Sequence, residues 1–185
     1  MTYFVTGATG FIGRFLVQSL LARGKGTVYV LVRPKSLGKL DELREFWGKE
    51  SVRRVVPVKG DLAQPKLGVS KADLAKLKGK VKHFFHLGAV YDLEASAETM
   101  HEANITGTQT ALAFAEAVNA GCFHLVSSIA AAGLYRGTFT EDMFEEAEDL
   151  DHPYYRTKHD SEGLVRANER VPYRIYRPGV VVGHS

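Results

Sequence analysis

The 185-residue chain is 45% hydrophobic and carries a formal net charge of +3, with charges of both signs interspersed along it. This composition suits one packed domain and excludes a disordered or fibrous protein. The small net charge gives no reason to expect a nucleic acid or a membrane surface as partner, and the single cysteine, Cys122, excludes an internal disulfide framework.

The N-terminus shows no targeting segment. A strand-like run begins at Tyr3 without a preceding basic stretch and apolar core, and no apolar run in the sequence is long enough to span a bilayer. We therefore expect a cytoplasmic protein without an integral membrane segment.

Short runs rich in β-branched and aromatic residues alternate with longer segments of helical period. The candidate strands are residues 3–6, 27–32, 55–58, 81–87, 123–127 and 173–176, and the candidate helices are residues 11–23, 73–77, 95–119 and 156–169. This alternation predicts an α/β fold of the Rossmann type, a doubly wound parallel sheet with helices on both faces in three α/β/α layers and strand order 3-2-1-4-5-6. The acidic residues 140–151 are expected to form a surface loop.

The first predicted strand leads into the sequence VTGATGFIGR, which places glycines at positions 7, 10 and 13. In a unit that binds a dinucleotide, the first glycine allows a tight turn, the second lets the backbone approach a pyrophosphate, and the third lets the helix pack close to the strand. The helix N-terminus then offers N–H groups and a positive dipole end to the phosphates. Gly7, Gly10 and Gly13 therefore predict a dinucleotide cradle; the alternative is a glycine-rich turn that binds nothing.

The end of the second predicted strand is where such folds distinguish NAD from NADP. The sequence there is Leu31-Val32-Arg33-Pro34-Lys35, which has no carboxylate for a ribose 2′-hydroxyl. The Arg33 guanidinium can bind a 2′-phosphate through two N–H groups, and Lys35 can add charge. NADPH is therefore the predicted cofactor; the alternative is that Arg33 is a solvated charge at a strand end.

Tyr154 and Lys158 lie four residues apart where the last predicted helix opens, so that both project from one helix face. A phenol with an ordinary pKa of about 10 is a poor acid or base near neutral pH, and a nearby cation favours its ionised form. The pair is a weak signal of a catalytic site when taken alone, and a strong one together with the cradle.

Along its whole length the chain resembles the extended short-chain dehydrogenase/reductase family. The matching stretches, in order, are TGATGFIG (6–13), GDL (60–62), HLGA (86–89), NITGT (104–108), VSS (126–128), the Tyr154/Lys158 pair and RPG (177–179). Within the family, residues 31–34, the run VSSIAAAG from Val126 and residues 176–185 are similar to the branch of fatty acyl-CoA and thioester reductases.

The resemblance implies cofactor contacts for the residues that match its motifs. The implied set is Gly7, Thr9, Gly10, Phe11, Ile12, Gly13, Arg33, Asp61, Leu62, Leu87, Gly88, Ala89, Asn104, Tyr154, Lys158, Pro178, Gly179, Val180 and Val181. Residues 61–62 would flank the adenine, residues 87–89 would line the pyrophosphate and ribose, and residues 178–181 would border the nicotinamide. Asn104 would support the fourth strand and the active-site water, with an ordinary helix-surface asparagine as the alternative.

The resemblance also implies the catalytic residues Ser128, Tyr154 and Lys158 and the reduction of an acyl thioester by NADPH. Tyr154 would donate a proton to the developing oxyanion, Ser128 would hydrogen-bond to it, and Lys158 would hold the ribose and tune Tyr154. The product would be an aldehyde, which a second hydride could reduce to the alcohol. Ser127 stays open as the alternative to Ser128.

Other functions remain to be distinguished from a fatty acyl-CoA reductase. One is another extended short-chain enzyme, such as a nucleotide-sugar epimerase or dehydratase with tightly held NAD, against which Arg33 argues. Another is a non-catalytic NADP-binding module, in which Tyr154 or Lys158 is often lost.

The remaining expectations concern metals and the extent of the chain. The seven histidines show no paired-ligand spacing, so no metal site is predicted and His86 is expected to be structural. Residues 1–185 are expected to be one NADP-binding domain, the N-terminal part of a longer reductase that acts on a small-molecule substrate and lacks here its C-terminal substrate-binding part. Helices of this fold often pair between subunits, which allows a homodimer.

Overall fold

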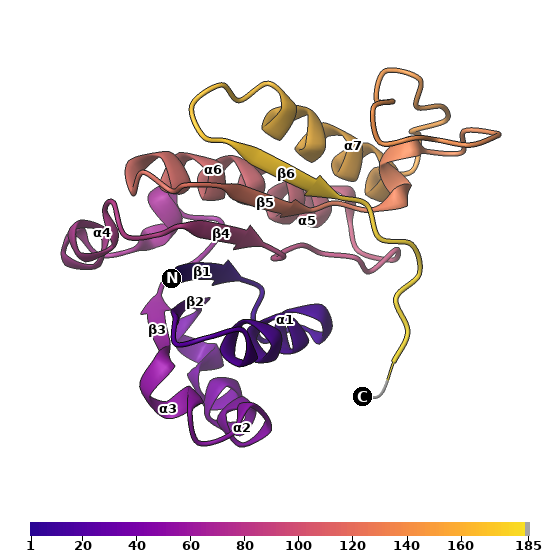
Figure 1. Ribbon diagram of the computed structural model, residues 1–185. Helices are drawn as coiled ribbons and strands as arrows, with labels where there is room; N and C mark the ends of the chain where they lie inside the picture. Colours follow the sequence, from indigo (N-terminus) through magenta and orange to yellow (C-terminus); the bar gives the residue numbers. More distant parts are fainter. Residues whose placement is uncertain (184–185) are drawn as a thin grey trace.

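The computed structural model describes residues 1–183 as a six-stranded parallel sheet flanked by helices (Figure 1). The strands are β1 Thr2–Thr6, β2 Thr27–Val32, β3 Val55–Lys59, β4 His83–His86, β5 Phe123–Val126 and β6 Tyr173–Tyr176, and their order is β3-β2-β1-β4-β5-β6. The predicted α/β fold and strand order are confirmed, and the predicted strand ends lie within two residues of those observed. His184 and Ser185, the end of the last stretch that resembles the reductase branch, lie outside the described residues.

Seven α-helices connect these strands within residues 1–183. They are α1 Phe11–Ala22, α2 Leu37–Trp47, α3 Ser51–Arg54, α4 Lys71–Leu77, α5 Ala97–Met100, α6 Gly107–Ala117 and α7 Pro153–Arg166. Short 3-10 turns cover Pro34–Ser36, Pro65–Gly68 and Ile129–Ala132, and a π-helical segment, His101–Thr106, joins α5 to α6. In this part of the chain no helix is long and apolar enough to cross a membrane.

Side chains that alternate along the strands supply two separate apolar cores. Phe4 of β1 packs with Phe84 and Phe114 in a core beneath α4, α6 and α7, whereas the next residue, Val5, packs with Leu40 in a core beneath α1 and α2. Figure 1 shows these two groups of helices on opposite sides of the sheet. The two cores give the predicted three layers.

Two helical regions differ from the sequence-based expectation. No helix is predicted between the second and third strands, yet α2 and α3 lie there. α2 buries Leu40 and Trp47 and packs Leu37 and Leu43 partly buried against the same core, and this helical spacing of apolar residues is the signal that could have found it. The single helix predicted over 95–119 contains the π-helical segment, whose wider turn ends where α6 begins.

The chain leaves β1 and β4 toward opposite faces of the sheet. β1 and β4 are neighbours whose last paired residues are Thr6 and His86; β1 continues into α1 on one face, and β4 continues toward α5 and α6 on the other. In open α/β sheets such a parting creates a crevice at the carboxyl ends of the strands, where ligands bind.

Candidate active site

A cavity of about 870 Å³ opens at this crevice. Its lining includes every candidate residue of the sequence analysis except Lys35, Asn104 and Val180, namely Gly7, Thr9, Gly10, Phe11, Ile12, Gly13, Arg33, Asp61, Leu62, Leu87, Gly88, Ala89, Ser127, Ser128, Tyr154, Lys158, Pro178, Gly179 and Val181. Val180 is 90% exposed and lies outside the lining. The volume is in the range of cofactor and ligand sites.

The glycine turn between β1 and α1 fits a pyrophosphate. Gly7 has a left-handed φ of 71°, and a Cβ atom built on it would lie 2.8 Å from the backbone nitrogen of Gly88. A Cβ atom on Gly13 would overlap the carbonyl oxygen of Gly7. Gly10 caps α1 without a side-chain hydrogen bond, so the first N–H groups of α1 face the cavity without a side chain between them, as anion binding requires.

The ends of β2 and β3 form the side of the cavity at which the sequence analysis predicts the adenosine to bind. Arg33 is exposed and lines the cavity beside Ser36, whose backbone N–H donates to the Arg33 carbonyl oxygen at 2.8 Å. Ser36 was not a sequence candidate, and its position three residues after Arg33, in a turn opened by Pro34, is the signal that could have found it. Leu62 fills the space that a side chain at residue 88 would need, because a Cβ atom on Gly88 would overlap Leu62 Cδ1.

Helix α7 presents Tyr154 and Lys158 to the cavity. It begins at Pro153, three residues before the predicted start, because the His152 ring caps it: His152 Nδ1 accepts the Tyr154 backbone N–H at 3.1 Å. Lys158 is 5% exposed and donates from Nζ to the Val126 carbonyl oxygen at 3.2 Å. Burial lowers the pKa of Lys158 to about 8, against the opposing effect of the Glu162 charge.

The two serines after β5 have different partners. Ser127 is buried and donates its hydroxyl to Glu162 Oε2 at 3.0 Å. Ser128 Oγ accepts the Ala130 backbone N–H at 3.1 Å, and this leaves the hydroxyl proton of Ser128 available for another acceptor. The geometry therefore favours Ser128 as the hydroxyl that can donate into the cavity.

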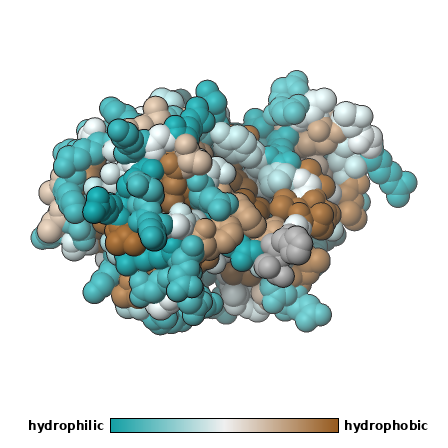
Figure 2. Space-filling view, turned by 60° about the horizontal axis from the view of Figure 1, so that its bottom comes forward, coloured by the Kyte–Doolittle hydropathy of each residue, from teal (hydrophilic) through white to brown (hydrophobic). Residues whose placement is uncertain are grey.

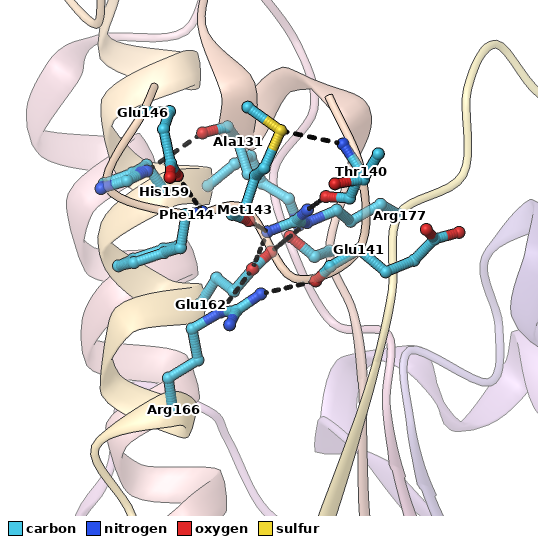
Figure 3. Close-up of polar contacts among 12 residues, drawn as sticks. Ala131, Thr140, Glu141, Met143, Phe144, Glu146, His159, Glu162, Arg166 and Arg177 are labelled. Atoms are coloured by element: carbon cyan, nitrogen blue, oxygen red, sulfur yellow. Dashed lines mark hydrogen bonds and ion pairs between the residues drawn. The ribbon is translucent and has the colours of Figure 1, made fainter. Parts of the chain in front are cut away.

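Glu162 is a buried carboxylate on α7, four residues after Lys158, and Figure 3 shows its polar contacts. It accepts Arg166 Nε at 2.9 Å, Arg177 Nε at 3.1 Å and Arg177 Nη2 at 2.5 Å, in addition to the Ser127 hydroxyl. Burial alone would raise the pKa of Glu162, but the hydrogen bonds from these groups, Arg177 first, lower it below its ordinary value. Glu162 thus joins α7 to the ends of β5 and β6.

The same two arginines attach residues 139–144 to α7. Arg177 donates to the carbonyl oxygens of Thr140 at 3.0 Å and Met143 at 2.7 Å, and Arg166 donates to that of Glu141 at 3.2 Å. In Figure 3 these carbonyl groups converge on the two guanidinium groups from the loop side. The loop predicted over 140–151 is therefore held beside α7 by hydrogen bonds from the Arg166 and Arg177 side chains to its backbone carbonyl oxygens.

Asn104 is not a helix-surface residue. It is 2% exposed in the π-helical segment; its Nδ2 donates to the carbonyl oxygen of Val90 at 3.0 Å and to Thr157 Oγ1 at 3.1 Å, and its Oδ1 accepts the Val90 backbone N–H at 2.8 Å. The surface alternative is wrong. Asn104 holds the segment that follows β4 against α7 from behind the cavity wall.

Residues of α5 and the π-helical segment also line the cavity without having been sequence candidates. They are Thr99, Glu102 and Ala103, and Tyr91 precedes them in the same wall. No group of three or more His, Cys, Asp or Glu side chains arranged for a metal ion occurs among residues 1–183.

Comparison with known proteins identifies the family of the chain. Residues 5–185 match the NAD-binding family model described as Male sterility protein. The chain is 34% identical, over 98% of its length, to one of the subunits of the linear gramicidin synthase of Brevibacillus parabrevis. It is 29% identical to the Drosophila melanogaster protein named "Putative fatty acyl-CoA reductase CG8303" over 97% of its length.

A solved structure shares the fold closely. The terminal R domain from the myxalamid PKS-NRPS biosynthetic pathway superimposes with a TM-score of 0.86 and 33% identity over the whole chain. The chain spans 50% of that domain, 41% of the Drosophila protein and 4% of the gramicidin synthase polypeptide.

Proposed function

Because the chain belongs to the Male sterility protein family, in the fatty acyl-CoA and thioester reductase-like branch of the extended short-chain dehydrogenases/reductases, we propose that it takes part in the NADPH-dependent reduction of a fatty acyl-CoA to the aldehyde. The observation that carries this proposal is the convergence of the glycine cradle, Arg33, Ser128, Tyr154 and Lys158 on one cavity.

The residues of the cavity can each be given a part in that reaction. When bound, the nicotinamide supplies the hydride that adds to the thioester carbonyl carbon. Tyr154 donates a proton to the developing oxyanion, and the Ser128 hydroxyl hydrogen-bonds to it. The Lys158 ammonium binds the ribose hydroxyls beside Tyr154. The resulting hemithioacetal expels the thiol and leaves the aldehyde, which a second hydride and proton convert to the alcohol.

Arg33 and Ser36 are the residues we assign to the 2′-phosphate of NADPH. Both line the cavity just after β2. The cavity residues at the end of β2 include no carboxylate that would bind a ribose 2′-hydroxyl instead. A guanidinium with an adjacent hydroxyl matches a phosphate in charge and hydrogen-bond donors.

An apolar acyl chain suits the exposed side chains at the cavity mouth. Tyr91 is 78% exposed and Val181 47% exposed, and both line the cavity; Ile129, directly after Ser128, is 56% exposed. Figure 2 shows hydrophobic side chains gathered toward the right of the face, whereas the left is largely hydrophilic. Exposed apolar surface beside a polar site is typical of a binding region for an apolar ligand.

The test is the loss of nicotinamide absorbance when the protein meets a long-chain acyl-CoA, with NADPH and NADH run in parallel and free coenzyme A as the control. Oxidation of NADPH that depends on acyl-CoA supports the proposal. Oxidation with the free fatty aldehyde but not with acyl-CoA would replace it with an aldehyde reductase. NADPH binding without turnover of either substrate would favour the non-catalytic module.

A further inference from the structure

His86 is a buried histidine whose two ring nitrogens both have hydroxyl partners. It ends β4 and is 2% exposed; its Nδ1 lies 2.7 Å from Thr6 Oγ1 and its Nε2 lies 3.1 Å from Thr108 Oγ1. Thr6 and His86 are also the last residue pair before β1 and β4 part. The proposed reaction uses neither contact.

The partners of Thr108 determine which ring nitrogen carries the proton. The Thr108 hydroxyl lies 2.6 Å from the backbone carbonyl oxygen of Asn104, and a carbonyl oxygen only accepts, so Thr108 donates its single proton there. Toward His86, the Thr108 oxygen can therefore act only as an acceptor. His86 Nε2 must be the protonated nitrogen.

The partners of Thr6 determine that the other ring nitrogen, His86 Nδ1, carries no proton. Thr6 Oγ1 accepts the Gly88 backbone N–H at 3.2 Å, and it shares the Leu87 N–H, also at 3.2 Å, with the Thr6 carbonyl oxygen at 3.3 Å. Because these two groups only donate to Thr6 Oγ1, its own proton is donated to His86 Nδ1. A second proton on the ring would leave the Thr6 hydroxyl without an acceptor. Burial first, and then the Lys158 charge, lower the pKa of His86 to about 3, in agreement with a neutral ring.

The hydrogen-bonded path continues from Asn104 to the catalytic helix. The Asn104 amide donates to Thr157 Oγ1 at 3.1 Å, and Thr157 donates to the Tyr154 carbonyl oxygen at 3.2 Å. All four side chains of the path within the core, Thr6, His86, Thr108 and Asn104, are at most 2% exposed. One continuous path therefore runs from the Leu87–Gly88 wall of the cradle to the first turn of α7.

We propose that His86 is a positioning residue of the cofactor site, which acts through Thr6 and Thr108 to hold the Leu87–Gly88 wall in register with the helix that carries Tyr154 and Lys158. This inference rests on the proposed binding of a nicotinamide cofactor in the cavity. The register matters because the space between Gly7 and Gly88 admits no extra atom: a Cβ atom on Gly7 would lie 2.8 Å from the Gly88 nitrogen. A small shift of Gly88 therefore changes the cradle itself.

The first test is spectroscopic and needs neither cofactor nor substrate. In ¹⁵N NMR spectra of the histidine rings, His86 is expected to show a protonated Nε2 and an unprotonated Nδ1, with no titration between about pH 5 and about pH 8. A protonated Nδ1, or a ring that titrates in that range, would overturn the hydrogen-bond assignment. This result stands even if the protein reduces no thioester.

The second test compares two buried histidines. His124 is 4% exposed and bonds to His83 and Tyr176 rather than to the cradle. H86F is expected to weaken NADPH binding roughly tenfold, the effect of about one lost hydrogen bond, whereas H124F should leave it nearly unchanged. Equal affinities for H86F and the wild type, or equal losses in both variants, would contradict a positioning role.

A third comparison keeps the inference testable should H86F fail to fold. T108V removes the acceptor of the His86 Nε2–H group and T108S restores it. T108V is expected to lower NADPH affinity several-fold and kcat with it, and T108S to return both close to wild type. Similar behaviour of the two variants would count against the inference. If the wild type binds neither NADPH nor NADH, the proposed function fails, while the NMR result still decides the assignment of His86.

Discussion

Tyr154 is the side chain on which the proposed reaction depends most. Tyr154→Phe keeps the ring and removes the proton donor, so turnover should fall by about 10²- to 10⁴-fold while NADPH affinity stays nearly unchanged. Steady-state kinetics and a fluorescence titration measure the two quantities. Tyr155→Phe is the matched control, because Tyr155 is the adjacent phenol on α7 and does not line the cavity. Full turnover in Tyr154→Phe would remove it as the proton donor.

Arg33 makes a separate prediction about the choice of cofactor. Arg33→Ala should weaken NADPH binding by roughly ten- to a hundredfold, because charge-assisted hydrogen bonds to a phosphate are lost. NADH binding should hardly change. Arg23→Ala, at an exposed arginine at the end of α1, controls for the loss of one surface charge. A parallel loss of affinity for both cofactors would show that Arg33 does not recognise the 2′-phosphate.

The sequence predicted the position of some site residues and missed others. The cradle glycines and the Tyr154/Lys158 pair were predictable because each group lies within one short segment. The glycine spacing fits a turn from strand to helix, and residues four apart share one helix face. Glu162 was not, because its partners Ser127 and Arg177 come from two other segments. From the sequence alone, Glu162 cannot be distinguished from an exposed charged residue on a helix.

The same contrast holds for whole elements. The six strands were predictable because compact β-rich runs lie between turn residues. Helix α2 was missed although Leu37, Leu40 and Trp47 recur at helical spacing, because five charged residues lie between them and only Leu40 and Trp47 are fully buried. The π-helical segment depends on the hydrogen bonds of Asn104 with Val90 and Thr157, which exist only once β4 and α7 are in place.

The attachment of α7 to β5 and β6 gives a prediction about stability. Glu162→Gln removes the charge from a carboxylate that is 0% exposed and leaves two guanidinium groups without their counter-ion, which should cost about 3 kcal/mol or more in the free energy of unfolding. Glu116→Gln, which breaks an ion pair with the largely exposed Arg170, should cost less than about 1 kcal/mol. Urea denaturation compares the two, and losses of equal size would show that the Glu162 network does not hold α7.

The molecule as a whole should lose stability in mild acid. The pKa of His86 is lowered to about 3 and that of His124 to about 4, by burial first in each case. Below pH 6.5 the unfolded chain binds protons at these positions and the folded chain does not, so the contribution of the two histidines to stability is complete above about pH 6.5 and declines as the pH falls toward their folded-state pKa values.

For His86 alone this decline amounts to about 2 kcal/mol between pH 6.5 and pH 5. Urea denaturation at both pH values should therefore show a smaller pH dependence in His86→Phe than in the wild type. An unchanged dependence would mean that His86 is not the neutral, buried group described above.

The place of β1 in the sheet has a consequence for the order of folding. Among the six strands β1 is synthesised before the others, yet its pairing with β4 needs residues about eighty positions later, as the Thr6–His86 contact shows. Strands β1, β2 and β3 with α1 and α2 already share an apolar core and can form early. Until β4 is synthesised, one edge of β1 has no partner, and such an edge is open to association between nascent chains.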